Sequence, residues 1–274
     1  DVFQCKCSNE YVDGDRTLKF TFSIRGNEVV TPFQLSPTPM SGQRVFDLRR
    51  MNLSGIDMSG VDLEGADMTG AILKRANLRE ANLKRANLTG VVLIEANLKR
   101  ANLREANLIE ANLEGADMTE ANLIEADLRE ANLIEANLIE ADMTDAELEG
   151  TVLTRANLTR ANLTRAYLTR AYLREANLEG ADMTDAELEG TVLTRANLRE
   201  ANLIEANLIE ADMTDAELEG TVLTRANLTR ANLTRAYLIE ANLTGAVLID
   251  AELEGTVLID AELEGTVLAE VSVQ

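Results

Sequence analysis

Residues 121–140 read ANLIEADLREANLIEANLIE, a five-residue unit of alanine, a polar residue, leucine and two further residues. The unit continues in both directions, so that a leucine or methionine occupies every fifth position from Leu48 to Leu268, 45 in all. We call this the centre position, and the residue two before it, mostly alanine, the small position. The other three positions are largely polar. A repeat this uniform predicts one repetitive architecture.

The period of five discriminates between the regular backbone conformations. In a helix, each residue advances by 100°, so the apolar positions would spread around the helix instead of forming one face. In a plain strand, side chains alternate between faces, and an odd repeat would reverse the pattern in every unit. The repeat therefore favours a short extended segment with two inward residues, followed by a turn. Four such sides would close a square coil of about 20 residues.

The pattern Ala-(Asp/Asn)-Leu-Xaa-Xaa resembles the pentapeptide-repeat family, which is abundant in cyanobacteria. The resemblance covers residues 46–270. It implies an all-β fold, a right-handed quadrilateral parallel β-helix with the small and centre positions inside. We therefore expect residues 46–274 to form a solenoid of about 11 coils, roughly 55 Å long at the usual spacing of strands.

Charges at the last position of the unit support the length of the coil. This position holds twelve arginines, no two of which are separated by 20 positions. Ten of the twelve have an acidic residue 20 positions away. Residues at this separation would be stacked neighbours, where like charges are unfavourable, so the spacing agrees with the predicted coil.

Residues 1–45 are predicted to form an N-terminal β cap and a linker. Apolar and polar residues alternate from Leu18 to Arg25, as in a half-buried strand. Gly26 and Asn27 suggest a turn into a second strand over 28–35, and residues 2–7 are a candidate third strand. The predicted linker is marked by Pro37, Pro39 and Gly42.

The two ends of the predicted solenoid differ. An open solenoid end exposes apolar core and strand edges, and it needs a cap. The first four small positions are bulky, so we expect the first coil to contact the N-terminal cap; they are Phe46, Met51, Ile56 and Val61. No such feature follows Leu268. Either the native chain continues there, or the C-terminal coil pairs with something, end-to-end self-association included.

Composition excludes several classes of function. There is no histidine, which removes the usual general base and the commonest zinc ligand. The net charge of −21 falls entirely after residue 45, because residues 1–45 hold five acids and five bases. Such a surface repels nucleic acid and anionic membranes. No apolar run is long enough for membrane insertion. We expect a soluble protein, with the cytoplasm favoured over the periplasm or thylakoid lumen.

Neither the cysteines nor the carboxylates indicate a chemical site. Cys5 and Cys7 are too close for an unstrained disulfide and lack partners for zinc, so we interpret them as ordinary thiols on a strand. The Asp and Asn residues just before each centre could suggest calcium, but bonding to nearby backbone and stacking in ladders explain them better. We expect no cofactor, no metal and no enzymatic activity. The chain starts at Asp1, as a shortened or processed form would.

Arginine and tyrosine mark a candidate protein interface. Four arginines of successive units, 155 to 170, would circle the rod once, and tyrosines replace asparagine nearby. Tyrosine and arginine are enriched at interface hot spots. The candidate residues are Arg155, Arg160, Arg165, Tyr167, Arg170, Tyr172 and Tyr237.

These observations favour a non-enzymatic rod that binds an unknown protein partner as a scaffold or interaction surface. The alternative is a DNA mimic that inhibits a topoisomerase such as gyrase, because the resemblance includes relatives with that activity and the rod is acidic. The loops, C-terminal dimerising helix and aromatic centres that those relatives commonly carry are missing from this sequence.

Overall fold

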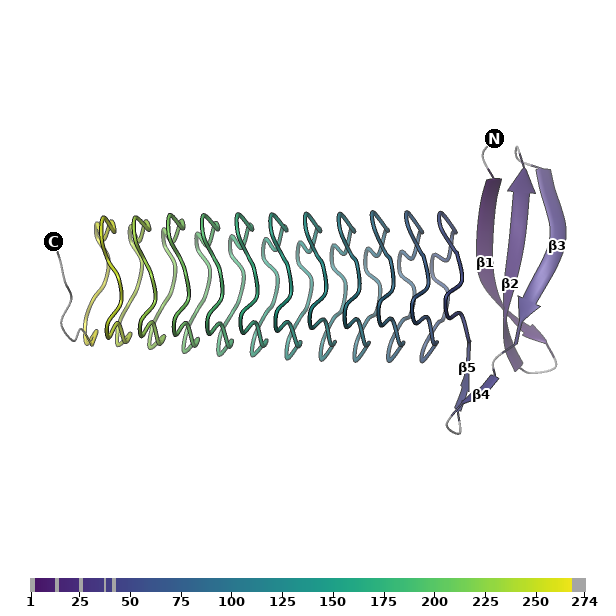
Figure 1. Cartoon of the computed structure of the whole chain (residues 1–274), viewed down its shortest axis with the longest axis horizontal. Coiled ribbons are helices and arrows are strands. Elements are labelled where there is room, and N and C mark those ends of the chain that lie inside the picture. The colour runs from purple at the N-terminus through teal and green to yellow at the C-terminus, as the bar shows by residue number, and fades with distance from the viewer. Residues whose placement is uncertain (1–2, 13–14, 25–26, 37, 41–42, 268–274) are drawn as a thin grey trace.

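The computed structural model describes residues 3–12, 15–24, 27–36, 38–40 and 43–267. Within the first 45 residues, it describes the side chains of residues 6–10, 17–20 and 36. Figure 1 shows a long coil with a small sheet across its N-terminal end. The predicted turn at Gly26 and the last centre, Leu268, lie outside the described residues.

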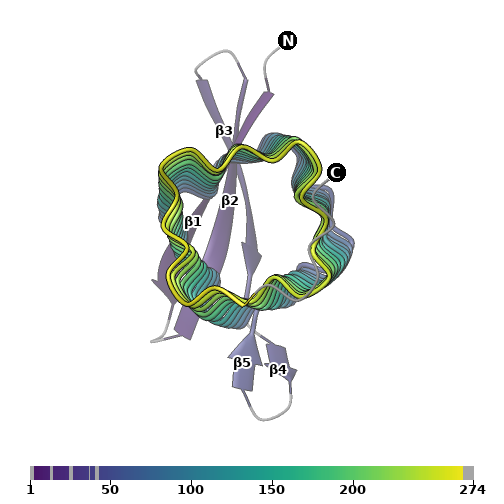
Figure 2. The ribbon, with the colours of Figure 1, turned by 90° about the vertical axis from the view of Figure 1, so that its left-hand side faces the viewer.

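Parallel pairing between successive coils builds the rod. The residue just before each centre pairs with its counterpart 20 positions later, from Asp47 with Asp67 through Val247 with Val267. Because the unit has five residues, one coil has four sides, and Figure 2 shows the resulting four-cornered outline along the axis. The predicted square coil and its length are confirmed.

The unit 131–135 illustrates how the backbone N–H groups are used. Those of Leu133 and Glu135 donate to carbonyls of the next coil (2.7 and 3.0 Å), and that of Asn132 donates to the preceding coil (2.9 Å). The N–H of residue 131 donates to the previous centre carbonyl at 3.0 Å and closes a β-turn. The N–H of Ile134 donates to Oδ1 of Asn132 at 3.1 Å. All five donors are therefore satisfied, as folded backbone requires.

Asparagine and aspartate just before the centre serve the backbone. Every Asn or Asp at this position in the described chain accepts a bond from the N–H two residues later, at 2.9–3.3 Å. Several also bond along a column, as Asn102 Nδ2 does to Asn82 Oδ1 at 3.1 Å. The prediction that these residues bond nearby backbone and stack in ladders is confirmed.

The second residue after each centre, which we call the corner position, has left-handed backbone. Its φ lies between 54° and 68° at all 44 described corners, of which 31 are not glycine. A side chain in this conformation costs roughly 1–2 kcal/mol. Charged residues nevertheless occupy most corners. The backbone hydrogen bonds between coils, such as that from the Glu135 N–H to Thr154 O, must therefore outweigh this cost.

The interior is a column of leucine, methionine and alanine. Apart from the partly buried Met51 and three buried threonines, the centre and small residues from Phe46 to Ala251 form one buried cluster. Where threonine replaces alanine, its hydroxyl donates to a centre carbonyl, as Thr151 Oγ1 does to Leu128 O at 2.9 Å. In the described chain no buried side-chain nitrogen or oxygen lacks a partner. The core therefore contains no uncompensated polar group.

Three antiparallel strands form the N-terminal sheet in the order β1, β2, β3, with bounds Phe3–Val12, Asp15–Ile24 and Asn27–Leu35. Strand β2 includes most of the stretch predicted from alternation, β3 matches the strand expected over 28–35, and β1 extends beyond the candidate strand over 2–7. Strand β1 lies against the first coil, where the Cys7 N–H donates to Asp57 O at 2.6 Å. The Asp62 N–H donates to Asn9 Oδ1 at 2.6 Å. Cys7 and Phe20 are buried in the same cluster as Phe46, so the sheet contacts the bulky first coil.

The segment predicted as a linker contains a hairpin. Strand β4 is Thr38–Met40 and strand β5 is Gln43–Val45, paired antiparallel. Pro39 lies within β4, in a two-stranded sheet where each strand is an edge and a missing N–H is tolerated. Pro37 and Gly42 lie outside the described residues.

Truncating a leucine in the middle of the rod should destabilise it far more than truncating a leucine in the last described coil. Leu128 is fully buried, whereas Leu263 is 44% exposed. We expect Leu128→Ala to lower the free energy of unfolding by about 2–5 kcal/mol, because it leaves a cavity. Leu263→Ala should cost clearly less. Denaturant unfolding followed by circular dichroism measures both, and equal losses would contradict the stacked core.

Replacing a charged corner residue with glycine should stabilise the protein. Glu130 has a φ of 59°, which glycine adopts without strain. After allowance for the freer unfolded chain, we expect Glu130→Gly to raise the free energy of unfolding by up to about 1 kcal/mol. The matched control is Ala131→Gly, next to it in an ordinary conformation and buried, which should destabilise. A loss of stability in Glu130→Gly would show that corner strain is negligible.

Candidate protein-binding surface

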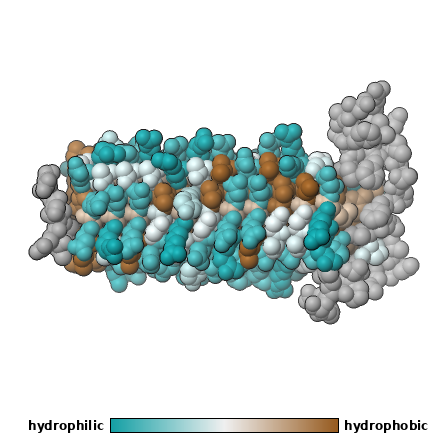
Figure 3. Space-filling view, in the orientation of Figure 1, coloured by the Kyte–Doolittle hydropathy of each residue, from teal (hydrophilic) through white to brown (hydrophobic). Residues whose placement is uncertain are grey.

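The outer surface of the rod consists of columns of side chains, to which each coil contributes one residue per column. Figure 3 shows mostly hydrophilic residues on one face, with hydrophobic ones scattered among them. Six large apolar side chains are exposed in the described chain: Tyr167, Tyr172, Tyr237, Ile259, Leu263 and Val267. The last three belong to the last described coil. Self-association through this coil stays a prediction.

Corner arginines pair along the columns. All ten corner arginines that have an acid one coil away lie within 4.0 Å of its carboxylate. Arg75 Nε, for example, is 2.6 Å from Glu95 Oε2. The prediction that charges at this separation are stacked neighbours is confirmed. Exposed pairs of this kind add little stability each, typically below about 1 kcal/mol.

Two corner arginines of the described chain form no ion pair, Arg50 and Arg170. Glycines occupy the stacked corners beside them: Gly70 next to Arg50, and Gly150 and Gly190 on either side of Arg170. A Cβ added at Gly190 would lie 3.6 Å from Cγ of Arg170, which places the two corners in contact. Arg170 therefore stands between two gaps in its column, with its guanidinium available to a ligand.

Tyr167 and Tyr172 lie on adjacent sides of one coil, with the Arg170 corner between them. Their side chains are 46% and 51% exposed. Tyr167 pairs in its column with Glu147 and Glu187, so its neighbours are acidic. Of the predicted interface, the structure thus brings Tyr167, Arg170 and Tyr172 together around one corner.

The other predicted interface residues lie elsewhere on the rod. Arg155, Arg160 and Arg165 occupy the three remaining corners, since they belong to the three preceding units. They pair with Glu135, Glu140 and Asp145 respectively. Tyr237 lies on a third side, in a column with Glu217 and Val257. The seven residues therefore do not form one continuous surface.

Sequence reasoning missed the neighbours that make the Tyr172 side distinctive. Val152 and Val192 flank Tyr172 in its column. Arg174, two residues after Tyr172, is exposed and forms no ion pair in the described chain. The sequence does contain the signal, because residues 20 positions apart are stacked neighbours. This offset was applied to charged residues and not to apolar ones.

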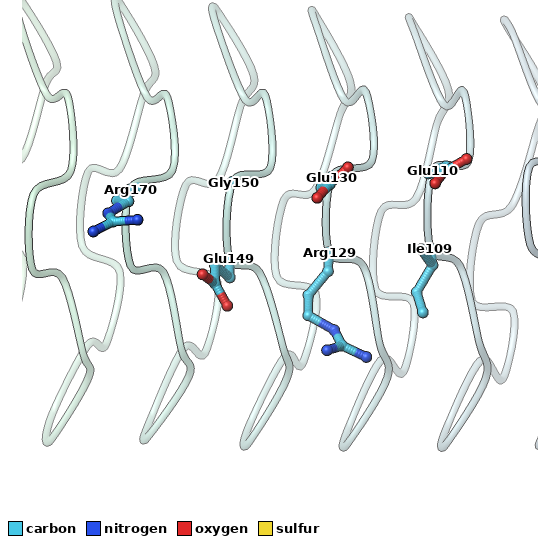
Figure 4. Close-up of a pocket in the computed structure, with 7 residues that line it drawn as sticks. All are labelled: Ile109, Glu110, Arg129, Glu130, Glu149, Gly150 and Arg170. Carbon is cyan, nitrogen blue, oxygen red and sulfur yellow. The ribbon is translucent and has the colours of Figure 1, made fainter.

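A shallow pocket of about 330 Å³ opens beside Arg170. Figure 4 shows why: the corner residues of successive coils are aligned, and Gly150 leaves a gap between Glu130 and Arg170. Its other lining residues are Ile109, Glu110, Arg129 and Glu149. Mixed charges around a gap suit a partner's side chain rather than an enclosed substrate.

The titrating groups do not suggest acid–base catalysis. Every carboxyl group in the described chain whose pKa is clearly shifted has a lowered pKa, whereas a general acid at neutral pH needs a raised one. The hydrogen bond from the Arg129 side chain lowers the pKa of Asp127, and Arg165 does the same for Asp145. These carboxylates are therefore held ionised by surface arginines.

The described residues contain neither a metal-binding group nor a membrane-spanning helix. No group of three or more Cys, Asp or Glu side chains is arranged to hold a metal ion. No helix in the described chain has the length and apolar character needed to cross a bilayer.

Comparison with protein families gives the classification. The sequence model described as pentapeptide repeats matches eight segments that together extend from residue 47 to 272. The chain belongs to the pentapeptide-repeat family. The predicted resemblance is confirmed, and membership in the pentapeptide-repeat family implies a right-handed β-helix.

Similar solved structures include two pentapeptide-repeat proteins from cyanobacteria and one resistance protein. HetL, involved in heterocyst differentiation regulation in the cyanobacterium Nostoc sp. strain PCC 7120, is 35% identical over 85% of this chain and 95% of its own, with a TM-score of 0.48. Rfr23 from the cyanobacterium Cyanothece 51142 is 33% identical over 45% of this chain and 91% of its own, with a TM-score of 0.21. QnrB1, a plasmid-mediated fluoroquinolone resistance protein, is 16% identical over 74% and 89%, with a TM-score of 0.46. No curated protein matches the chain.

Removing Arg129 should lower the free energy of unfolding by an amount that depends on pH. Arg129 Nε and Nη2 lie 2.9 and 2.6 Å from the two carboxylate oxygens of Asp127. Because the folded-state pKa of Asp127 is lowered, the pair stabilises the protein above the ordinary pKa of about 4, and its contribution is lost as the pH falls through the folded value. The variant Arg129→Thr introduces threonine, which is common directly after the centre elsewhere in the chain.

We expect wild type to exceed Arg129→Thr in free energy of unfolding by a few tenths to about 1 kcal/mol near neutral pH, and we expect the difference to disappear once the pH falls below the lowered folded-state pKa of Asp127. Denaturation at several pH values measures it. The self-repulsion of the acidic rod affects both proteins almost equally. The difference therefore reports the exchange of the ion pair for the neutral bond that threonine makes to aspartate at this position, as Thr144 Oγ1 does to Asp142 Oδ1 at 2.6 Å. A difference that does not change with pH would contradict the lowered pKa of Asp127.

Proposed function

We propose that this protein is a non-enzymatic, protein-binding solenoid that acts as a scaffold or interaction rod. The observation that carries the proposal is the unbroken register of pairing from Asp47 to Val267, in which every residue just before a centre pairs with its counterpart 20 positions later. Backbone bonds hold every outward residue in a fixed column, so each side is a flat, rigid surface. Repeat proteins commonly use such extended surfaces for binding.

The N-terminal sheet is proposed to cap this rod. In support, β1 continues the pairing beyond the first coil, and Cys7, Leu18 and Phe20 are buried in the cluster that includes Phe46. A capped end protects both the strand edge and the apolar column from other chains.

Affinity capture with the full chain tests the proposal. The control bait is an unrelated protein of similar size and net charge, because an acidic surface retains basic proteins nonspecifically. We expect a defined partner that is absent from the control and that co-elutes with the rod when the two are purified separately and mixed. If the purified chain retains only what the acidic control retains, the binding role is wrong.

An alternative proposal is a DNA mimic that inhibits a topoisomerase such as gyrase. It is supported by the net charge of −21, all of which belongs to residues after 45. The pairing of ten corner arginines with acids argues against a uniformly acidic surface. A supercoiling assay with excess rod over gyrase decides: an unchanged rate eliminates this alternative.

A further inference from the structure

The Tyr172 side of the rod is framed by a duplicated segment. Residues 147–155 and 187–195 have the identical sequence Glu-Leu-Glu-Gly-Thr-Val-Leu-Thr-Arg. Their offset of 40 is two coils, so they lie on the same sides, with residues 167–175 stacked between them. The frame places valine on both sides of Tyr172, threonine on both sides of Arg174 and glycine on both sides of Arg170.

The middle of this frame combines an apolar column with free positive charge. Val152, Tyr172 and Val192 are paired neighbours, and the tyrosine side chain is 51% exposed. Arg170 and Arg174 flank Tyr172 in the same coil, and neither forms an ion pair with the described residues. We call these five residues the Tyr172 patch. Buried tyrosine and arginine contacts dominate the energy of many interfaces.

The same side also presents unused backbone donors. Asparagine or aspartate before the centre normally accepts the N–H two residues later, as at Ile134 (3.1 Å). Valine and tyrosine have no such acceptor in three successive coils here, and in the described chain no hydrogen bond is made by the N–H groups of Thr154, Arg174 and Thr194. Such donors favour a ligand that brings carboxylate or carbonyl oxygens.

The framed part of this side carries more arginine than acid, unlike the rod as a whole. In the three framed coils, the Tyr172 side and its two corners carry Arg155, Arg170, Arg174 and Arg195 against one acid, Glu175. Arg155 and Arg195 are paired with Glu135 and Asp215 one coil farther out, so the unpaired positive charge is that of Arg170 and Arg174. The chain as a whole has a net charge of −21. At physiological salt, charges farther than about 8 Å are largely screened, so a ligand seated on the patch senses Arg170 and Arg174 more strongly than the net charge of distant coils.

We propose that the Tyr172 patch docks an extended, acidic segment of a partner protein, a specific form of the protein-binding function proposed above. Carboxylates of the segment would bond Arg170, Arg174 and the free N–H groups, while its apolar side chains cover Tyr172 and the two valines. The adjacent side carries Glu147, Glu149, Glu187 and Glu189, which disfavour a long polyanion such as nucleic acid spreading past the corner.

The test measures binding of a fluorescein-labelled peptide in which glutamate alternates with valine, by anisotropy with the full chain near physiological salt. We expect saturable binding, and none to a peptide with lysine in place of glutamate. The variant combines Arg170→Gly, Tyr172→Asn and Arg174→Thr, each of which introduces a residue common at its position elsewhere in the chain. We expect its affinity to fall by about tenfold or more.

The matched control is Tyr237→Asn, the same exchange on another side of the rod, which should bind like wild type. Val152→Asn adds a second arm: it caps the N–H of Thr154 without removing charge, and it should weaken binding several-fold. Circular dichroism verifies that every variant keeps its fold.

Binding that is unaffected in the triple variant, or that favours the lysine peptide, would overturn the proposal. Competition by duplex DNA at lower concentration than by the acidic peptide would assign the patch to nucleic acid instead. If a captured partner binds wild type and the triple variant equally, the protein-binding function stands and this patch is wrong. If wild type captures no partner at all, the function itself fails.

Discussion

The hydrogen bonds that join each coil to the next determine almost everything else in this protein. Their parallel register, which stays the same along the whole rod, places every side chain directly beside its counterpart in the next coil. An inward leucine therefore always meets an inward leucine or methionine, and an outward residue always meets an outward one. Beyond Phe46, the described core of the rod contains no aromatic residue, because the backbone, rather than the shape of large side chains, specifies which residues touch.

The same register makes the surface a set of columns in which composition can be read by position. At the corners, ten arginines are paired with acids of the neighbouring coil. The two that are not, Arg50 and Arg170, have glycine at the stacked corners instead. On the sides, asparagine and aspartate satisfy the turn N–H groups. Around Tyr172, both the corner ion pairs and the Asn or Asp bonds to turn N–H groups are missing. The surface there presents unpaired arginines and unpaired N–H donors to a ligand.

Much of the fold could be predicted because a period of five is compatible with very few backbones. The length of the coil and the inward leucines follow from spacing, and the strand that contains Leu18 follows from alternation. The left-handed corners could not be predicted at residues such as Glu130 and Arg170, because charged side chains usually avoid that conformation. Only the 13 corner glycines indicated it. The hairpin of β4 and β5 was also missed, since its prolines suggested a linker.

The candidate surface was only partly predictable for a different reason. Tyr167, Arg170 and Tyr172 are close in sequence, so their proximity was visible. Val152 and Val192 each lie one coil from Tyr172, and their contribution depends on applying the coil length to apolar residues as well as to charges. Tyr237 was grouped with them because it is also a tyrosine close to corner arginines in the sequence. Residue type alone does not indicate which side of the rod a residue occupies.

The four-sided coil also has an evolutionary consequence. Gain or loss of one five-residue unit would leave the interior unchanged, yet it would rotate everything downstream by a quarter turn and bring different walls into line. The three identical segments 141–155, 181–195 and 211–225 illustrate both outcomes: the first two are aligned, and the third is turned by half a revolution. Such a chain can acquire new exteriors by slippage during copying, with no need to redesign its centre.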